Sequence, residues 1–359
     1  MAAPVSKQGD GAATPAWASG FELVRVEEAE STLTARWREI VATAGATPSA
    51  RSLTLNLVTY VDRPDACTDV SQILAEIAGT HSIRAVTIIE DATVDEDAIQ
   101  AFIRPDDHAD AQGFSEEVFV RVNPRASASA ASAVLALLAA DLPIYLWWRG
   151  DSPFGRPLFR LLAPLVKKIV VDSMRFGDTN ASLDTLRRLT ERRAGHVAVA
   201  DLNWKRLKPW RQAVAACFDD PQVLALIGDF DKCRVEYAAD LDQPDTQHKT
   251  AGATLFAGWL ARCVPRLRGR VRLAPVANAG ARPGRLIAAL FQSSRSQTEL
   301  SLRRQDSPRQ VVAEVRDAQG GLIRSWNFHV VKATEAELLH RSIDDPSRDA
   351  MLEAALAEE

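Results

Sequence analysis

Closely spaced cysteines are missing from this sequence. The chain has four, Cys67, Cys217, Cys233 and Cys263, and their wide separation excludes a CxxC redox motif and a zinc knuckle. We expect reduced, inert thiols, as is usual in a reducing cytoplasm. The six histidines are scattered singly, so no local group of metal ligands forms and no metal site is predicted.

Long hydrophobic runs are absent as well. The longest apolar stretches, such as Ala133–Ala140, fall well below the roughly 20 residues that a membrane span requires. Residues 1–20 are rich in alanine but lack the cationic start and apolar run of a signal peptide, so a disordered leader is predicted. A net charge of −4 gives no overall attraction to nucleic acid or to an anionic membrane. We therefore expect a cytoplasmic protein that binds neither.

The motifs that carry familiar chemistry are also absent. The sequence has no GxxxxGK[ST] phosphate loop, no GxGxxG after a strand, no HExxH and no GxSxG. Adjacent acidic residues, such as Asp219 and Asp220, lie in turn-like contexts where carboxylates are usually solvated or cap a helix. We therefore predict no catalytic residue and no cofactor.

What is present is the pattern of an α/β protein. The chain has 359 residues, 47% of them hydrophobic, which suffices for two domains or one large one. From about residue 22, short apolar runs alternate with helical stretches, and right-handed crossovers would place such strands in one mostly parallel sheet flanked by helices. We predict an α/β domain over residues 21–221. Its strands are expected at Ser52–Val61, Ser82–Glu90, Glu117–Val122, Leu142–Trp148, Lys168–Asp172 and His196–Ala200.

After Pro221 strands predominate, which predicts a smaller α+β domain over residues 222–359 with an antiparallel sheet. Gly320 and Gly321 supply one hairpin turn, and Thr334 with Glu337 forms a capping box that starts a helix. The acidic tail beyond that helix is expected to fray. The strands are expected at Lys232–Ala239, Val271–Pro275, Leu286–Phe291, Glu299–Arg304, Gln310–Arg316 and Ser325–Lys332.

Two segments are candidates for function, and the first is LPIYLWWRGD. Here an apolar strand ends in Trp147, Trp148 and Arg149 before a Gly-Asp-Ser-Pro turn. Ligands and partners tend to lie at the carboxyl ends of strands in open α/β sheets, and an aromatic pair followed by arginine suits an anion, a sugar or a protein hot spot. The alternative is that both tryptophans belong to the core, each with a partner for its indole N–H.

The second segment is DLNWKRLKPWR, residues 201–211, at another junction between a strand and a helix. Pro209 is well placed as the first residue of the helix, and Trp210 recurs with Val214 and Cys217 at helical spacing, so Trp210 is expected to be structural. The remaining polar and aromatic residues crowd one short loop, where a functional and a packing role are both open. They are Asp201, Asn203, Trp204, Lys205, Arg206 and Lys208.

Together with RSLTLNLV at Arg51–Val58, these segments resemble the OpcA family, the glucose-6-phosphate dehydrogenase assembly proteins. The resemblance covers roughly residues 35–332. It implies a non-catalytic partner that binds glucose-6-phosphate dehydrogenase, promotes its active oligomer and activates it at the start of the oxidative pentose phosphate pathway. Residues that match the family motif are candidates for partner or ligand binding, or for maintaining the domain: Trp147, Trp148, Arg149, Asp201, Asn203, Trp204, Arg206, Pro209, Trp210 and Arg211.

Two further expectations follow from this resemblance. Cyanobacterial members are associated with thiol control, but this chain has no close cysteine pair and none after Cys263, so redox regulation is not expected. We predict that Trp148, Arg149, Trp204 and Arg206 form the interaction surface. The rival hypothesis is a sugar-phosphate-binding enzyme or metabolite sensor that uses a cleft at the strand carboxyl ends.

Overall fold

The computed structural model describes residues 15–44, 53–105, 115–192, 197–243, 249–277, 280–305 and 309–358. The chain divides by its contacts into two compact units, Met1–Leu142 and Pro143–Glu359. The predicted boundary at residue 221 falls inside the second unit, where parallel strands give way to a largely antiparallel sheet. That boundary therefore marks a change of architecture, and as a domain boundary it stays a prediction. No described helix is both long and apolar enough to cross a lipid bilayer.

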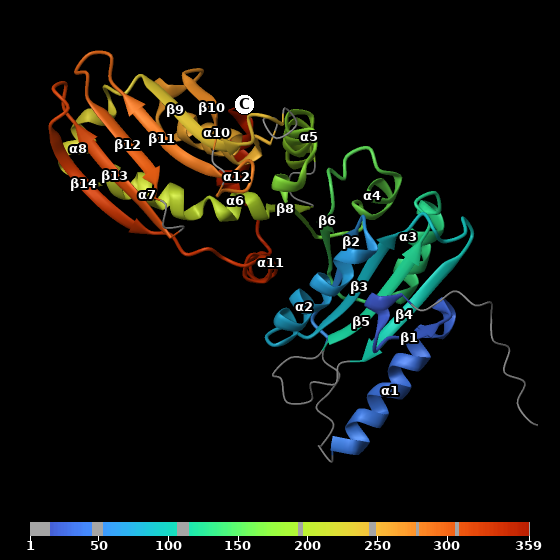
Figure 1. Cartoon of the computed structure of the whole chain (residues 1–359). Helices are drawn as coiled ribbons and strands as arrows, with labels where there is room; N and C mark the ends of the chain where they lie inside the picture. Colours follow the sequence, from blue (N-terminus) through green and yellow to red (C-terminus); the bar gives the residue numbers. More distant parts are fainter. Residues whose placement is uncertain are drawn as a thin grey trace, which may run out of the picture. The chain divides into compact units, whose positions relative to one another are not determined.

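The first unit is built on a sheet whose strands are ordered β1-β4-β5-β3-β2 (Figure 1). The central strands β2, β3 and β5 are parallel, and every residue of β2 is buried, as expected for a parallel sheet covered on both faces. Its elements are β1 (Glu22–Val24), α1 (Ala29–Ala44), β2 (Leu55–Val61), α2 (Cys67–Ala78), β3 (Ile83–Glu90), β4 (Ile99–Pro105), β5 (Ser115–Val122) and α3 (Ser127–Leu137).

Part of the predicted leader belongs to this fold. Residues 1–14 lie outside the described residues, but a short 3₁₀ turn, Ala16–Ala18, follows directly. Trp17 in this turn packs edge-on against Phe102 and Phe119, with ring centroids 5.1 and 5.4 Å away. The expectation of disorder up to residue 20 is therefore wrong for this turn, because an aromatic side chain has a hydrophobic site on the sheet to fill.

The second unit begins with three parallel strands in the order β6-β7-β8. These are joined by helices, as the alternation of strand and helix patterns predicts. The segment 202–206, predicted as a loop, is instead a short helix, which begins where the Asp201 side chain accepts the N–H of Asn203. The elements are β6 (Ile144–Arg149), α4 (Pro157–Leu162), β7 (Lys168–Val171), α5 (Thr179–Arg192), β8 (Ala198–Asp201), α6 (Leu202–Arg206), α7 (Lys208–Phe218) and α8 (Pro221–Ile227).

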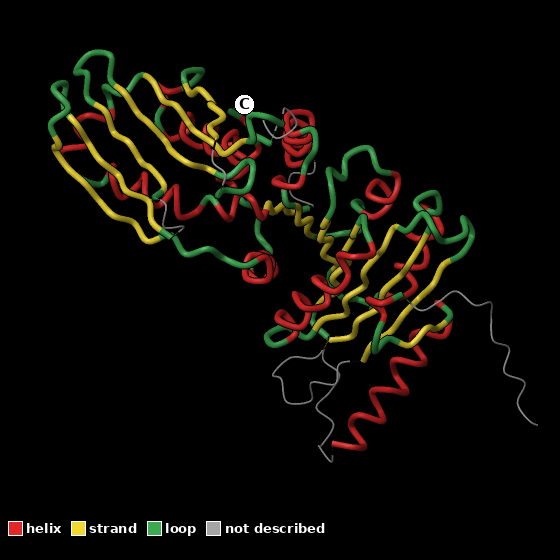
Figure 2. Tube along the Cα trace, viewed as in Figure 1, coloured by secondary structure: helices red, strands yellow, loops and turns green. Residues whose placement is uncertain are grey.

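A second sheet follows, whose strands are drawn in yellow like the others in Figure 2. In the part of the chain that the structure describes, their order is β10-β9-β11-β12-β13-β14. The meander from β11 to β14 is antiparallel, as predicted. Strand β10 is a correction, since it runs parallel to β9 after a helical crossover through α10. The elements are β9 (Lys232–Ala239), α10 (Ala251–Cys263), β10 (Val271–Ala277), β11 (Leu286–Gln292), β12 (Glu299–Arg304), β13 (Gln310–Arg316) and β14 (Leu322–His329).

The last segment of the chain is helical rather than frayed. Helix α11 (Glu335–Asp344) begins at the predicted capping box, and α12 (Ala350–Ala357) follows it. Leu352 and Leu356 of α12 are buried. A Cβ atom at Gly258 of α10 would lie 2.1 Å from the carbonyl oxygen of Ala355, so the two helix backbones touch where α10 has no side chain. The prediction of fraying is wrong because α12 fills this position.

Candidate functional site

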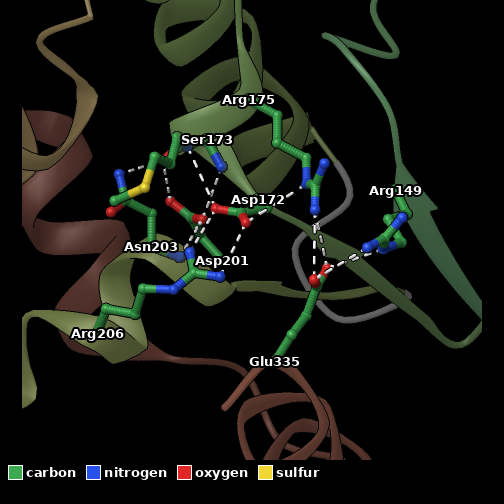
Figure 3. A network of polar contacts seen from close by, with 9 residues as sticks. Arg149, Asp172, Ser173, Arg175, Asp201, Asn203, Arg206 and Glu335 are labelled. Atoms are coloured by element: carbon green, nitrogen blue, oxygen red, sulfur yellow. Dashed lines mark hydrogen bonds and ion pairs between the residues drawn. The ribbon is translucent and has the colours of Figure 1, made fainter. Parts of the chain in front are cut away.

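The parallel strands of the second unit bring three charged residues to one edge. Strand β6 ends at Arg149, Asp172 follows β7 directly, and β8 ends at Asp201 (Figure 3). Because the carboxyl ends of parallel strands meet at the same edge of a sheet, both sequence motifs converge there. The resulting polar network is the candidate site.

Asp172 is the centre of the first half of this network. It is buried, and Arg206 of α6 donates from both terminal nitrogens to its two carboxylate oxygens, at 2.6 and 2.9 Å. Two parallel bonds of this kind give a strong and geometrically specific ion pair. Asp172 also caps the 3₁₀ helix η4 (Ser173–Arg175) by accepting the N–H of Met174. The sequence motif therefore holds the end of β7 against α6.

Asp201 lies beside this pair and is completely buried. Its carboxylate accepts the Ser173 hydroxyl at 2.6 Å and the backbone N–H groups of Ser173 and Asn203 at 3.0 and 2.9 Å. The Asn203 side chain in turn donates to the Ser173 hydroxyl oxygen at 3.0 Å. Burial, assisted by the negative charge of Asp172, raises the pKa of Asp201 to about 6 and outweighs these hydrogen bonds.

This shift predicts a pH dependence of stability. The pKa of Asp201 rises from an ordinary 3.8 to about 6 on folding, so the folded state binds the proton more tightly. The stability from this proton is fully present below about pH 4 and is lost as pH rises through about 6, a difference of about 3 kcal/mol. We expect this component to disappear in Asp201→Asn. Urea unfolding of both proteins from pH 4 to 7.5 measures it, and parallel profiles would contradict the prediction.

Glu335 of α11 joins the same edge from the carboxyl-terminal part of the chain. Arg149 donates to its two carboxylate oxygens at 3.2 and 3.4 Å, and Arg175 donates to both at 3.3 Å. Among the labelled residues of Figure 3, three guanidinium groups thus face three carboxyl groups. When Asp201 is ionised, the charges of this network cancel.

The tryptophans of the two motifs lie in the interior. The Trp204 side chain is 1% exposed, its indole N–H donates to Asp349 at 2.9 Å, and the Arg211 guanidinium lies 3.5 Å from its ring centroid. Burial lowers the pKa of Arg211 to about 10. Trp148 donates its indole N–H to the carbonyl oxygen of Asp151 at 2.9 Å. Both residues therefore satisfy the polar atom that burial would otherwise leave without a partner.

The remaining candidates are also structural in their contacts. Trp147 is fully buried, and its indole nitrogen finds no acceptor among the described residues. Trp210 is buried against Phe256, with 6.2 Å between ring centroids, as its helical spacing predicts. Pro209 lies in the first turn of α7, where its missing N–H costs nothing. Direct contact of the motif side chains with a partner stays a prediction, and their burial favours the alternative that they maintain the domain.

The predicted cleft at the strand ends corresponds to a narrow crevice. It is lined by Ser173, Asn203 and the glycines Gly252 and Gly284, and the space between them is too narrow to hold a water molecule. Typical small-molecule pockets have roughly 300 to 1,000 Å³. This crevice is smaller than a sugar phosphate usually requires, so the site as it stands favours a structural role over ligand capture.

Sequence reasoning did not identify Asp172, Arg175 and Glu335. Asp172 could have been found, because it closes the predicted strand Lys168–Asp172 in the way that Asp201 follows the next one. Glu335 gave no such signal. It lies 186 residues from Arg149 in sequence, and only the tertiary fold brings the two together.

Comparison with known proteins accounts for most of the chain. Residues 74–188 match the family described as glucose-6-phosphate dehydrogenase subunit N-terminal domain, and residues 197–356 match the corresponding C-terminal domain. The chain belongs to the OpcA family. Each match contains one of the two motifs. The family membership that the motifs led us to expect is therefore confirmed.

The curated relatives found are cyanobacterial. The chain is 36% identical over 126 residues to the OxPP cycle protein OpcA of Nostoc punctiforme, covering 35% of this chain and 25% of that one. It is 27% identical over 196 residues to the protein of the same name in Synechocystis, covering 53% and 39%. The chain thus aligns with less than half the length of either relative.

Solved structures offer only distant similarity. An oxidoreductase domain protein from Kribbella flavida aligns over 86% of this chain and 91% of its own, with 10% identity and a TM-score of 0.37. A likeness at this level carries no argument about function. The names of the OpcA relatives associate the family with the oxidative pentose phosphate cycle, and the family description associates it with glucose-6-phosphate dehydrogenase.

Proposed function

We propose that this chain is a non-catalytic partner that binds glucose-6-phosphate dehydrogenase, promotes its active oligomer and activates it allosterically. The observation that carries the proposal is the family match on both halves of the chain, whose descriptions name a subunit of that enzyme. The curated relatives add an association with the oxidative pentose phosphate cycle. We propose the cytoplasm as the place of this activity.

The chemistry of the strand-end network supports this proposal. Its carboxylates are engaged by arginines and backbone N–H groups, as in Asp172 with Arg206 and Glu335 with Arg149. Groups held in this way give rigidity to the junction between sheet and helices. An activator requires a rigid surface with higher affinity for one state of its partner, and no nucleophile or metal.

The test is a titration of the cognate enzyme with this protein. We expect a saturable rise in rate or a fall in KM for glucose 6-phosphate, together with a larger co-eluting species in size-exclusion chromatography with light scattering. A complex with no change in specific activity would indicate an assembly scaffold only. No complex and no rate change would refute the proposal.

The rival function, a sugar-phosphate sensor, is tested on the isolated protein. A ligand that binds only the folded state must raise its melting temperature. We expect no shift with glucose 6-phosphate or 6-phosphogluconate, because the crevice beside Ser173 is small. A concentration-dependent shift that Asn203→Ala abolishes would favour the sensor instead.

A further inference from the structure

Strand β14 is an edge of the second sheet that lacks the usual protection against pairing. Natural edge strands are commonly shielded by proline, by charge or by being very short. The opposite edge, β10, contains Pro275 and the exposed Arg272, and β1 of the first unit has three residues. Strand β14 has eight residues, LIRSWNFH, with no proline and no lysine. Proline, charge and short length thus protect β10 and β1 against pairing with another strand, and β14 has neither proline nor short length.

The charge on this edge is already neutralised. Arg324 pairs with Asp220 at 3.0 Å, on the face of the sheet that also carries Trp326 and Phe328. Apart from His329, no other side chain of β14 can ionise. Exposed aliphatic side chains lie at both ends of the strand, with Leu322 54% and Val331 67% exposed. An incoming strand would therefore meet no uncompensated charge on β14.

The direction of the backbone groups follows from one hydrogen bond. The N–H of Val330 donates to the carbonyl oxygen of Arg309 beside β13. Because neighbouring residues of a strand alternate in direction, the N–H and C=O groups of Ser325, Asn327 and His329 point away from β13. No strand lies beside them among the described residues. These groups form a row of donors and acceptors that another strand could satisfy.

We infer that β14 docks antiparallel against β14 of a second copy of this chain, about a two-fold axis at Trp326. In this register Ser325 lies opposite Asn327 of the second copy, so outward donors meet outward acceptors on both strands. Arg324 lies opposite Phe328 of the second copy, which suits a cation on an aromatic face. The two second sheets then form one continuous sheet with a self-complementary interface.

Neighbouring registers are less suitable. An axis at Arg324 would place that arginine opposite its own copy instead of Phe328, and would bring Leu322, where the register of β14 against β13 shifts, into the pairing. An axis at Ser325 would bring Leu322 into the pairing, where the register of β14 against β13 shifts. The axis at Trp326 pairs residues from Arg324 to Phe328, where the register of β14 against β13 is regular. This inference does not depend on the enzyme that the chain is proposed to bind.

The test uses two double variants that differ only in the sign of the charge at residue 327. Ser325 and Asn327 are exposed on the face opposite Trp326, so both variants should fold, which circular dichroism checks. Ser325→Lys with Asn327→Lys places like charges opposite each other twice across the interface. Ser325→Lys with Asn327→Glu places opposite charges there, and is the matched control.

Light scattering over a concentration series measures the outcome. We expect the wild-type mass to rise from 39.2 kDa toward twice that value. The lysine–lysine variant should dissociate at roughly tenfold higher concentration than the lysine–glutamate variant. Monomers at every concentration would overturn the inference, as would equal dimerisation of the two variants. If the chain is monomeric and the lysine pair instead weakens enzyme binding, the edge serves a strand of the enzyme and self-pairing is refuted.

Discussion

Replacing Trp204 by alanine should lower the free energy of unfolding of the second unit by about 4 kcal/mol. The side chain is almost fully buried, hydrogen-bonded to Asp349 and stacked with Arg211, so its removal leaves a cavity and a guanidinium without its aromatic contact. Urea denaturation followed by far-ultraviolet circular dichroism measures the loss. The same variant should lose enzyme activation only to the extent that it unfolds.

The matched control is Trp204→Phe, which keeps most of the ring and removes the indole N–H. We expect a cost of about 1 kcal/mol, since Asp349 still accepts the N–H of Leu352. If Trp204→Ala instead kept full stability and lost binding to glucose-6-phosphate dehydrogenase, the side chain would be a contact residue. That result would restore the interaction surface predicted from the sequence.

Replacing Arg206 by alanine should lower the free energy of unfolding by about 4 kcal/mol, because it removes the main partner of a buried carboxylate and leaves that charge behind. Asp172 would keep the N–H of Met174 and the more distant Arg175, whose Nε lies 3.7 Å away, and it would still face Asp201. Thermal and urea unfolding both report this loss. Replacing Arg206 by lysine should recover part of it, since one bond to the carboxylate can form.

The control for this prediction is Arg188→Ala on α5. Arg188 also pairs with an aspartate, Asp184, but more than half of its side chain is exposed. Exposed pairs contribute between 0 and about 1 kcal/mol, so stability should hardly change. Equal losses in the two variants would show that burial does not determine the contribution of the Asp172 pair.

Periodicity predicted the elements that have a distinctive pattern. The buried run LNLVTYV is β2, the strand at Lys168 is β7, and the capping box at Thr334 begins α11. The pattern did not predict β4 or α12. Strand β4 ends in Pro105, and the alanine-rich α12 has little polar contrast around it, so each depends on the surface against which it packs.

The residues of the candidate site were predictable from sequence where they lie at the end of a predicted strand. The motifs place Arg149 and Asp201 at the ends of two strands from sequence alone, and the structure brings them to the same edge. Exposure was not predictable, because a crowded loop and a short buried helix such as Leu202–Arg206 can have the same composition. Glu335, the partner of Arg149, could not be predicted, because no local sequence pattern relates the start of a helix to a strand 186 residues earlier.

The late position of α12 sets the order in which this protein can be completed during synthesis. Domains generally fold as they emerge from the ribosome, amino-terminal parts first. The interior of the second unit includes Leu352 and Leu356 of α12. The indole N–H of Trp204 lacks its hydrogen-bond acceptor until Asp349, 145 residues downstream, has been synthesised. Nascent chains that have released α10 but not yet α12 therefore carry Trp204 without its partner Asp349, and the α10 backbone at Gly258 lacks the helix that packs against it. Chaperones that recognise exposed aromatic residues have their longest opportunity to bind between the translation of α6 and that of α12.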